Sequence, residues 1–344
     1  MTLNDKTSDP LVTVENLRVA FHSADDTVHA VNGVDFAINR GEVLCILGES
    51  GSGKSVTMRA LMRLLPESKT KISGRIAIDG HEILNLDDRA MADLRGPKVA
   101  MIFQEPMTAF DPVFTIGDQI SETIRRHEGV SDSDARKLAL ELLELVQIPS
   151  AARRLKNYPF EMSGGMRQRA MIALALSCKP SLLLADEPTT ALDATVQIQI
   201  LLLLRQLQDE LGMAVVFVTH DIGVAMEIAD RIAVMYAGRF VEIGPVADMY
   251  RAPTHPYTKG LMASTVKGAM RGSRLQAIEG SPPDLTRLPP GCSFAPRCQV
   301  SEGRCVTEYP TTRVISPGHA AACIHAGSEA QLCADAPADA EAVQ

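Results

Sequence analysis

The chain has 344 residues, 46% of them hydrophobic and 22% charged, which is ordinary for a globular protein with one large domain and a smaller one. The net charge of −8 gives no electrostatic support to nucleic-acid binding, so we expect no nucleic acid among the partners. No apolar run approaches the roughly 18–20 residues of a membrane span, and the first ten residues lack the basic and apolar regions of a signal peptide. We therefore expect a cytosolic protein, in which seven cysteines are more often thiols or metal ligands than disulfides.

Residues 11–47 predict strands. Positions 12–21 largely alternate between apolar and polar, with a slip at Glu15–Asn16, and apolar residues recur at 31–38 after a polar loop. An antiparallel sheet is expected here. Phe21 ends the first strand, where it could stack on an adenine ring, although its position fits a core aromatic equally well.

A phosphate-binding P-loop, G-x-x-x-x-G-K-[ST], follows the apolar run 42–47 and precedes a predicted helix over 56–65. Its residues are Gly48, Glu49, Ser50, Gly51, Ser52, Gly53, Lys54 and Ser55. The glycines let successive N–H groups point at phosphate oxygens, and the helix N-terminus adds its positive end. Lys54 is expected to reach the β- and γ-phosphates, and Ser55 to hold Mg²⁺. A chance match in a glycine-rich turn is disfavoured because strand, lysine and serine are all in place.

Three further segments separate the P-loop from a helical region. The sequence predicts a strand at 74–80, a polar helix at 87–95 and an apolar strand at 98–103. Gln104 follows the last strand and leads into a loop with two prolines. From there it could reach Mg²⁺ or a water and move with the loop, although a surface glutamine would give the same pattern.

Residues 115–178 are predicted to be mainly helical, with Ser131 as one N-cap. Within them, Ser163-Gly164-Gly165 opens a helix, which is a second arrangement suited to binding an anion. Because serine is a common N-cap, this motif is weak alone, but it gains weight from the P-loop before it.

Two acids, Asp186 and Glu187, end the apolar run 181–185. A buried strand that ends in aspartate is the usual partner of a P-loop, with Asp186 holding Mg²⁺, and Glu187 can act as general base. Asp193 follows in a turn before a predicted helix over 195–211. His220 ends the apolar run 214–219, at the edge where α/β folds bind ligands, although a lone histidine is more often structural.

In order and spacing, these motifs resemble the nucleotide-binding domain of ABC transporters over residues 11–250. The segments 254–261, 280–283 and 289–298 resemble the C-terminal part of the ATPases of oligopeptide/dipeptide importers, which extends the resemblance to about residue 325. The motifs at 162–166 and 186–193 look like those of the first of two paralogous ATPases in such importers. The commonest signature, Leu-Ser-Gly-Gly-Gln, is changed at Met162 and Met166, which puts the side-chain contacts of Met166 in question.

The resemblance implies an α/β fold: a P-loop ABC-type nucleotide-binding domain over 1–250, with an antiparallel β subdomain and a helical subdomain at about 105–178. A small cysteine-containing extension would occupy 251–325, and the alanine- and aspartate-rich tail, 326–344, is expected to be disordered.

The resemblance also implies a head-to-tail dimer, with ATP between the P-loop of one subunit and Ser163, Gly164 and Gly165 of the other. Phe21 would stack on adenine, Asp193 would belong to the nucleotide site, and His220 would hold the γ-phosphate. Gln104 would couple Mg²⁺ and water to the permease contact, and Glu187, His220 and Gln104 would form the catalytic group.

The implied partners are a second paralogous ATPase, two transmembrane permease subunits and an extracytoplasmic solute-binding protein. They place the chain at the cytoplasmic face of the inner membrane, where it would energise import of di- or oligopeptides. Nickel or glutathione import, or a soluble ABC ATPase outside transport, are the alternatives. The last usually carries two cassettes or a long coiled coil, and neither is seen in the sequence.

Four cysteines lie close together near the C-terminus, at Cys292, Cys298, Cys305 and Cys323. Their spacing is not the C-x2-C pair of zinc sites, yet four thiolates in a short proline-rich segment suggest a metal, because so small a segment buries little core. By resemblance to the importer ATPases, a four-iron–four-sulfur cluster is expected, with Zn²⁺ as the second candidate. Free thiols packed as small hydrophobes are the third. A cysteine segment that senses redox state or metal and gates the ATPase is a further hypothesis.

Overall fold

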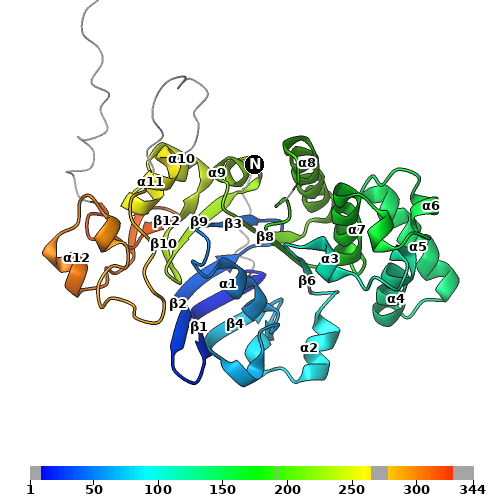
Figure 1. The fold of residues 1–344 in the computed structure, drawn as a ribbon, viewed down its shortest axis with the longest axis horizontal. Helices are drawn as coiled ribbons and strands as arrows, with labels where there is room; N and C mark the ends of the chain where they lie inside the picture. The colour runs from blue at the N-terminus through cyan, green and yellow to red at the C-terminus, as the bar shows by residue number, and fades with distance from the viewer. Residues whose placement is uncertain (1–8, 191, 265–277, 328–344) are drawn as a thin grey trace, which may run out of the picture.

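The computed structural model of the chain describes residues 9–190, 192–264 and 278–327. Figure 1 shows an elongated molecule with a helical lobe at one end and the C-terminal extension at the other. The β-sheets lie between these two ends, and α1 lies near the middle of the view. The helical lobe and the extension are therefore separated by the part of the chain that carries the P-loop.

The helices and strands follow the chain in the order expected from the sequence. The strands are β1 (Val12–His22), β2 (Thr27–Ile38), β3 (Val43–Leu47), β4 (Thr70–Ile78), β5 (His81–Glu82), β6 (Val99–Ile102), β7 (Leu182–Asp186), β8 (Ala214–Thr219), β9 (Arg231–Tyr236), β10 (Arg239–Pro245), β11 (Arg313–Ser316) and β12 (His319–Ala321). The α-helices are α1 (Lys54–Leu61), α2 (Asp88–Leu94), α3 (Pro106–Ala109), α4 (Ile116–Glu128), α5 (Asp132–Leu145), α6 (Ala151–Arg154), α7 (Gly164–Leu176), α8 (Ala194–Leu211), α9 (Ile222–Ile228), α10 (Val246–Arg251), α11 (Pro256–Ala263) and α12 (Gly303–Thr307). The 3₁₀ turns are η1 (Glu67–Lys69), η2 (Ile83–Asn85), η3 (Pro159–Glu161) and η4 (Ala295–Arg297).

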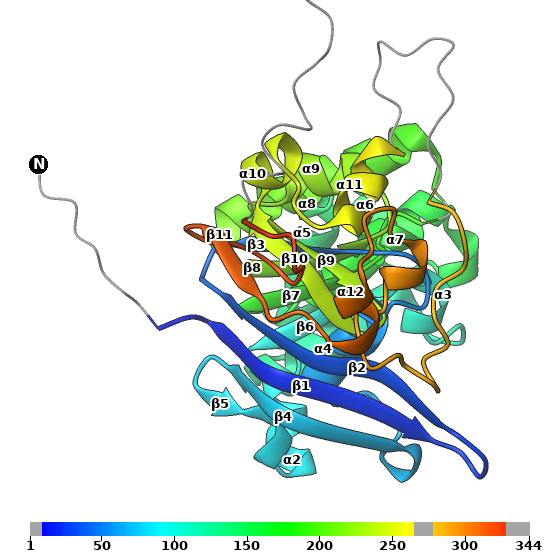
Figure 2. The same cartoon turned by 90° about the vertical axis from the view of Figure 1, so that its left-hand side faces the viewer.

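Two sheets form the framework. The first has four antiparallel strands in the order β2-β1-β4-β5, and Figure 2 shows it beside the second. The second has eight strands in the order β11-β12-β10-β9-β3-β8-β7-β6, of which β9, β3, β8, β7 and β6 run parallel. The predicted α/β fold with an antiparallel subdomain and a helical subdomain is confirmed.

The parallel strands explain why their sequences are apolar without alternation. Every residue of β3, β6, β7 and β8 is buried, because helices cover one face and the antiparallel sheet covers the other. Loops that leave the carboxyl ends of these strands therefore emerge at one edge of a rigid sheet. That edge is where the P-loop, Gln104, Glu187 and His220 are found.

Two local features follow from the backbone. The predicted slip in β1 is a break in register between Glu15 and Arg18, and Asn16 there has a φ of 45°. The helix predicted over 56–65 instead spans Lys54–Leu61, so its predicted end was wrong. Arg63 turns into the left-handed region with a φ of 48°, and Arg95 donates hydrogen bonds to the Met62 and Arg63 carbonyls, so the chain leaves the helix before Pro66.

The extension joins the larger sheet rather than forming a separate layer. Strand β12 pairs with β10, and the buried Glu242 of β10 accepts hydrogen bonds from the backbone N–H groups of Thr254 and His255. His319 of β12 contacts the same carboxylate at 2.8 Å. Burial raises the pKa of Glu242, but these hydrogen bonds outweigh it and hold the pKa below its ordinary value. The carboxylate thus fastens the extension to the sheet.

Two further sequence expectations concern membrane-spanning helices and the C-terminal tail. Among the helices that the structure describes, none is both long and apolar enough to cross a membrane. Most of the predicted disordered tail, residues 328–344, lies outside the described ranges, whereas Ala326 at its start is buried.

Candidate functional site

The P-loop joins β3 to α1, as its sequence predicts, and it needs glycine where its ends pass other backbone. A Cβ on Gly48 would lie 2.3 Å from the Met235 carbonyl oxygen, and one on Gly53 would lie 2.4 Å from that of Ala30. Gly53 also has a φ of 108°. Since neither position accepts a side chain, the loop can hold its curved path beneath an anion.

Lys54 is the cation of this loop, and its side chain is folded back onto it. Nζ donates to the carbonyl oxygens of Gly48 and Glu49, at 2.8 and 2.9 Å. Burial lowers the pKa of Lys54, while the carboxylates of Glu187 and Asp186 oppose this. The ammonium therefore lies within the loop and close to Asp186, which ends β7, and to Glu187, which follows it.

Ser55 and Asp186 come together across the sheet. Ser55 Oγ donates to Asp186 Oδ1 at 2.8 Å, and the Asp186 side chain is buried at the end of β7. Burial raises the pKa of Asp186, and the Ser55 hydrogen bond opposes the rise. A hydroxyl and a carboxylate in contact are hard oxygen donors, which is the ligand type that Mg²⁺ prefers.

The Glu187 carboxylate is contacted by two of the predicted residues, Gln104 and His220, and by Thr190. Its Oε2 accepts a hydrogen bond from Gln104 Nε2 at 3.2 Å, and its Oε1 lies 3.4 Å from Nδ1 of His220. Thr190 Oγ1 donates to Oε2 at 3.0 Å. Glu187 itself has a φ of 45°, a strained value for a residue with a side chain. The loops after β6, β7 and β8 thus converge on one carboxylate.

The second glycine-rich motif forms the start of α7 in the helical part. Ser163 is exposed, and its Oγ accepts a hydrogen bond from the Met166 N–H at 3.3 Å, so it caps the helix. The position that a side chain would occupy at Gly165 is next to Val196 of α8. Within the described ranges, no hydrogen bond links Ser163, Gly164 or Gly165 to the P-loop.

Two other predicted residues are less closely tied to the P-loop. Asp193 is exposed and caps α8, where its Oδ1 accepts a hydrogen bond from the Val196 N–H at 3.0 Å. Phe21 lies near the end of β1, half-buried against the core shared by the two sheets. The nucleotide-binding roles of Asp193 and Phe21 stay predictions.

The residues present fit ATP and Mg²⁺. The loop offers a lysine and a helix N-terminus to phosphates, while Ser55 and Asp186 offer oxygens to the cation. Ser52 Oγ is buried in the loop without a hydrogen-bond partner among the described residues. A buried hydroxyl is rarely left so, and a bound anion would satisfy it.

The four cysteines of the extension surround one cavity. Cys292, Cys298, Cys305 and Cys323 line a cavity of about 20 Å³ together with His255. Burial raises the pKa of the Cys292, Cys298 and Cys323 thiols, and the neighbouring cysteines add to the rise. In the described ranges, however, no group of three or more His, Cys, Asp or Glu side chains is placed to hold a metal ion. The expected metal at these cysteines is therefore not confirmed.

Three contacts at the site were missed by the sequence analysis. Thr190 lies inside the motif at 186–193, so its place beside Glu187 was within reach. Tyr257 and Arg297, both from the extension, contact Glu49 of the P-loop. Their segments were noted for resemblance alone, and nothing in their local pattern indicates a P-loop contact.

Comparison with known proteins assigns the two parts of the chain. Residues 31–190 match the model of the ABC transporter family, and residues 241–305 match that of the oligopeptide/dipeptide transporter C-terminal region. A Sinorhizobium fredii relative named "Probable peptide ABC transporter ATP-binding protein" is 50% identical over 92% of this chain and 95% of its own. The dipeptide transport ATP-binding protein of Bacillus subtilis is 47% identical over 92% of this chain and 94% of its own.

Solved structures agree with this assignment. A dimeric ATP-binding cassette bound to ADP and Pi superimposes with a TM-score of 0.62 at 32% identity, covering 68% of this chain and 98% of its own. The chain therefore belongs to the ABC transporter family, as an ATPase that carries the C-terminal region of the oligopeptide/dipeptide transporters.

Proposed function

We propose that this chain hydrolyses ATP at Glu187 and thereby energises import of di- or oligopeptides through a membrane ABC transporter. The observation that carries the proposal is the convergence of Gln104, Thr190 and His220 on the Glu187 carboxylate, beside the Ser55–Asp186 pair. The peptide class rests on the C-terminal region and on the relatives named for peptide and dipeptide transport. Nickel and glutathione remain the alternative cargoes.

In this mechanism, each residue has a defined task. Glu187 accepts a proton from the attacking water, while the hydrogen bonds from Gln104 and Thr190 fix the direction of its carboxylate. His220 holds the γ-phosphate, and Lys54 leaves the loop carbonyls to bind the β- and γ-phosphates. Ser55, Asp186 and Gln104 would hold Mg²⁺, which neutralises charge on the phosphates when bound.

Phe21 would complete the nucleotide site by stacking on adenine. Stacking of a base on an aromatic ring is worth about 1–3 kcal/mol, so Phe21→Ala should weaken ATP binding roughly 10-fold. Titration of the full chain with ATP and with inorganic triphosphate separates this role from packing. If Phe21→Ala weakened the binding of ATP and of triphosphate equally, Phe21 would be a core residue alone.

A second ATPase subunit would complete the site with its Ser163, Gly164 and Gly165, and Asp193 would lie at the same interface. Ser163 and Asp193 are exposed, and in the described ranges no hydrogen bond joins Ser163, Gly164 or Gly165 to the P-loop of this chain, which supports this arrangement. The dimeric cassette that superimposes on the chain supports it as well. We infer that the other subunit is a paralogue, with this chain as the first of the pair. Co-purification of a tagged chain with one other ATPase, rather than with a copy of itself, tests that inference.

The permease subunits would dock on the helical lobe. Apolar side chains are exposed just before α4 and in η3, with Phe114 54% and Phe160 63% exposed. Tyr158 stacks on Phe160, and the backbone of residue 116 bonds to that of residue 157, so these side chains share one surface. An exposed apolar surface next to the Gln104 loop is suited to a helix of a membrane partner. The chain would then lie at the cytoplasmic face of the inner membrane, with a solute-binding protein on the other side.

Peptide uptake by cells tests the proposed function. Cells that lack this chain are complemented with wild type, with Glu187→Gln, or with Glu210→Gln, which changes an exposed glutamate of α8. We expect labelled di- or oligopeptides to enter only with wild type and Glu210→Gln. Normal uptake of every peptide without the chain would overturn the peptide assignment, and normal uptake with Glu187→Gln would remove Glu187 from the role of base.

For the cysteine cavity, we propose a four-iron–four-sulfur cluster rather than Zn²⁺. The support is that all four cysteines line one cavity, because ligation by four thiolates alone suits such a cluster. Chain purified without oxygen should contain iron and acid-labile sulfide, which Cys298→Ser removes and Cys178→Ser, at a buried cysteine elsewhere, leaves in place. Stoichiometric zinc, or four thiols open to alkylation with no metal, would contradict the cluster.

A further inference from the structure

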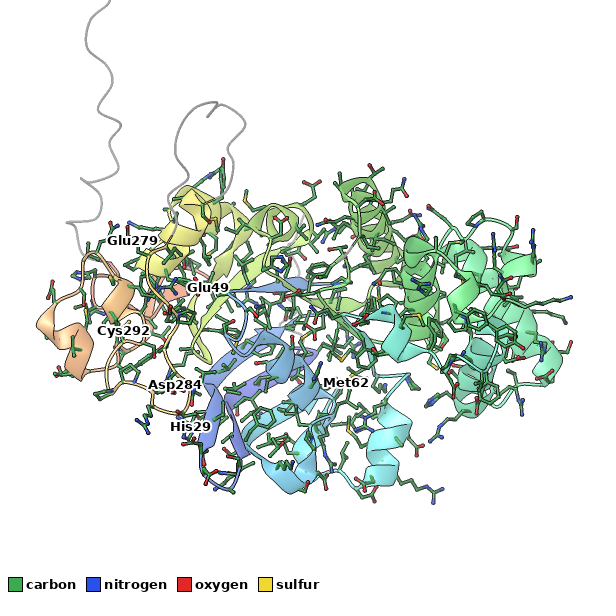
Figure 3. The ribbon with its side chains drawn as sticks, in the orientation of Figure 1. His29, Glu49, Met62, Glu279, Asp284 and Cys292 are labelled. Atoms are coloured by element: carbon green, nitrogen blue, oxygen red, sulfur yellow. The ribbon has the colours of Figure 1, made fainter. Side chains whose placement is uncertain are left out.

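Arg297 of the extension forms an ion pair with the P-loop. It ends the turn η4, between Cys292 and Cys298, and its guanidinium donates to both carboxylate oxygens of Glu49, at 2.9 and 3.1 Å. The Arg297 side chain is only 6% exposed. Figure 3 shows Glu49 on the side of the P-loop that faces the extension, with Glu279 and Cys292 beyond it. A paired, two-bond contact of this kind fixes both distance and orientation.

The rest of the guanidinium is fully used, which fixes its place. Nε donates to the Glu279 carbonyl at 2.9 Å, and Nη2 donates to the Ile278 carbonyl at 3.3 Å. Nη1 donates to the Tyr236 hydroxyl at 3.3 Å. These partners come from the segment after residue 277 and from β9, so Arg297 is held by both the extension and the sheet. The guanidinium is therefore held in one position beside Glu49, unlike an exposed arginine that changes rotamer freely.

The extension also holds Glu49 by its backbone. The Glu49 N–H donates to the hydroxyl of Tyr257 at 3.0 Å, and Tyr257 lies fully buried in α11. The amides of a P-loop can bind phosphate oxygens, but this one is already used by the extension. Side chain and main chain of the same P-loop residue are thus both fastened to the C-terminal region.

Glu49 in turn is connected to Lys54. The carbonyl oxygens of Gly48 and Glu49 are the two acceptors of Lys54 Nζ. A shift of the Glu49 peptide would therefore move the resting position of the lysine that must reach the phosphates. One continuous set of hydrogen bonds runs from Arg297 through Glu49 to Lys54.

We propose that Arg297 is a positioning residue of the nucleotide site, which keeps the P-loop in its phosphate-binding shape through Glu49. The inference rests on the proposed ATP site and adds to it a control from the C-terminal extension. Because Cys292 and Cys298 flank this turn and line the cysteine cavity, the contact also gives the gating hypothesis a physical route from that cavity to the P-loop.

ATP binding by the full chain tests the inference. The variants are Arg297→Gln, Arg297→Lys, Glu49→Gln and the double variant, and binding is measured by titration calorimetry with thermal melting alongside. The matched control is Arg313→Gln, because Arg313 lies in the same extension but donates to the Ile324 and Ala326 carbonyls, away from the P-loop.

We expect Arg297→Gln and Glu49→Gln each to raise the Kd for ATP roughly 5- to 20-fold, within the usual range of coupling between sites. The double variant should bind ATP no more weakly than either single variant. The Kd of Arg297→Lys should lie between those of wild type and Arg297→Gln, because lysine keeps the charge but cannot make the bidentate contact. Arg313→Gln should bind within twofold of wild type.

Two results would overturn the proposal, and they are distinct. A lower melting temperature of Arg297→Gln with an unchanged Kd would make the contact purely structural. If Arg297→Gln does not fold, the same decision rests on Arg297→Lys and Glu49→Gln. Failure of the wild-type chain to bind ATP would overturn the nucleotide-site assignment itself, and the inference with it.

Discussion

The two glycine-rich loops of this molecule have similar local chemistry and different surroundings. Each places serine and glycine at the start of a helix, the P-loop before α1 and the signature loop (residues 162–166) before α7. The P-loop lies among the side chains of its own chain: Ser55 bonds to Asp186, Lys54 lies near two acids and Glu49 is held by Arg297. In the signature loop, Ser163 bonds only to the backbone of its own helix among the described contacts.

The different surroundings indicate whether each loop finds its partners within one chain. In the proposed site, the P-loop has its lysine, its Mg²⁺ ligands and its general base within one chain, so we expect one copy to bind nucleotide. The signature loop offers a helix N-terminus and an exposed hydroxyl, and no acid, lysine or cation ligand of the described residues is bonded to that hydroxyl. We expect it to act on a nucleotide held by another subunit, so that binding and hydrolysis should be separable by mutation.

The largest effect is expected from Lys54→Ala. The substitution removes the buried ammonium that hydrogen-bonds the P-loop and would bind the phosphates, and bonds to charged groups are worth about 1.5–3 kcal/mol. ATP affinity of the full chain should fall on the order of 100-fold. Titration with ATP measures this, with Lys69→Ala at an exposed lysine as control. Wild-type affinity in Lys54→Ala would place the nucleotide elsewhere.

A smaller and different effect is expected from Ser163→Ala. ATP affinity of the full chain should stay within twofold, while hydrolysis by the assembled transporter falls roughly 10- to 100-fold because a donor to the phosphates is lost. Ser131→Ala is the matched control, since Ser131 caps α5 with the same geometry and its loss removes only a helix cap. Equal losses of hydrolysis in both variants would reduce Ser163 to a helix cap.

The sequence predicts the P-loop well because its requirements are local. A buried strand, close glycines and a helix follow one another within a few residues, and the structure confirms them at Gly48 and Gly53. The group around Glu187 was also within reach, because parallel strands bring their carboxyl ends to one edge. Gln104 and His220 lie far from Glu187 in the sequence, yet each directly follows an apolar run, and Glu187 comes one residue after such a run.

Other features depend on contacts that no local pattern encodes. The early end of α1 reflects the turn at Arg63 and the hydrogen bonds from Arg95, and neither is visible as a helix-stop signal. The pairing of Arg297 with Glu49 joins residues from opposite ends of the chain. In sequence, Glu49 is one of the free positions of the P-loop pattern, and only the fold shows that it is held by the extension.

The smallest effect is expected from Met166→Gln, which restores the commonest signature residue. Met166 is half-buried, its side chain packs against the core on the helical side of the larger sheet, and its N–H rather than its side chain bonds to Ser163. Because the backbone contact survives any side chain, ATP hydrolysis by the assembled transporter should change less than about threefold, in line with the small cost of most substitutions outside the core.

Met162→Leu is the natural control for this exchange. It restores the other altered signature position, but Met162 is buried, so a swap of similar volume should affect stability alone and cost under about 1.5 kcal/mol. A rise in hydrolysis of 10-fold or more in Met166→Gln, with Met162→Leu unchanged, would contradict our expectation. The two loops would then differ in side-chain chemistry as well as in surroundings. Met166 would lower the rate of ATP hydrolysis that the signature loop of this chain supports, and the partner subunit would have to compensate for it.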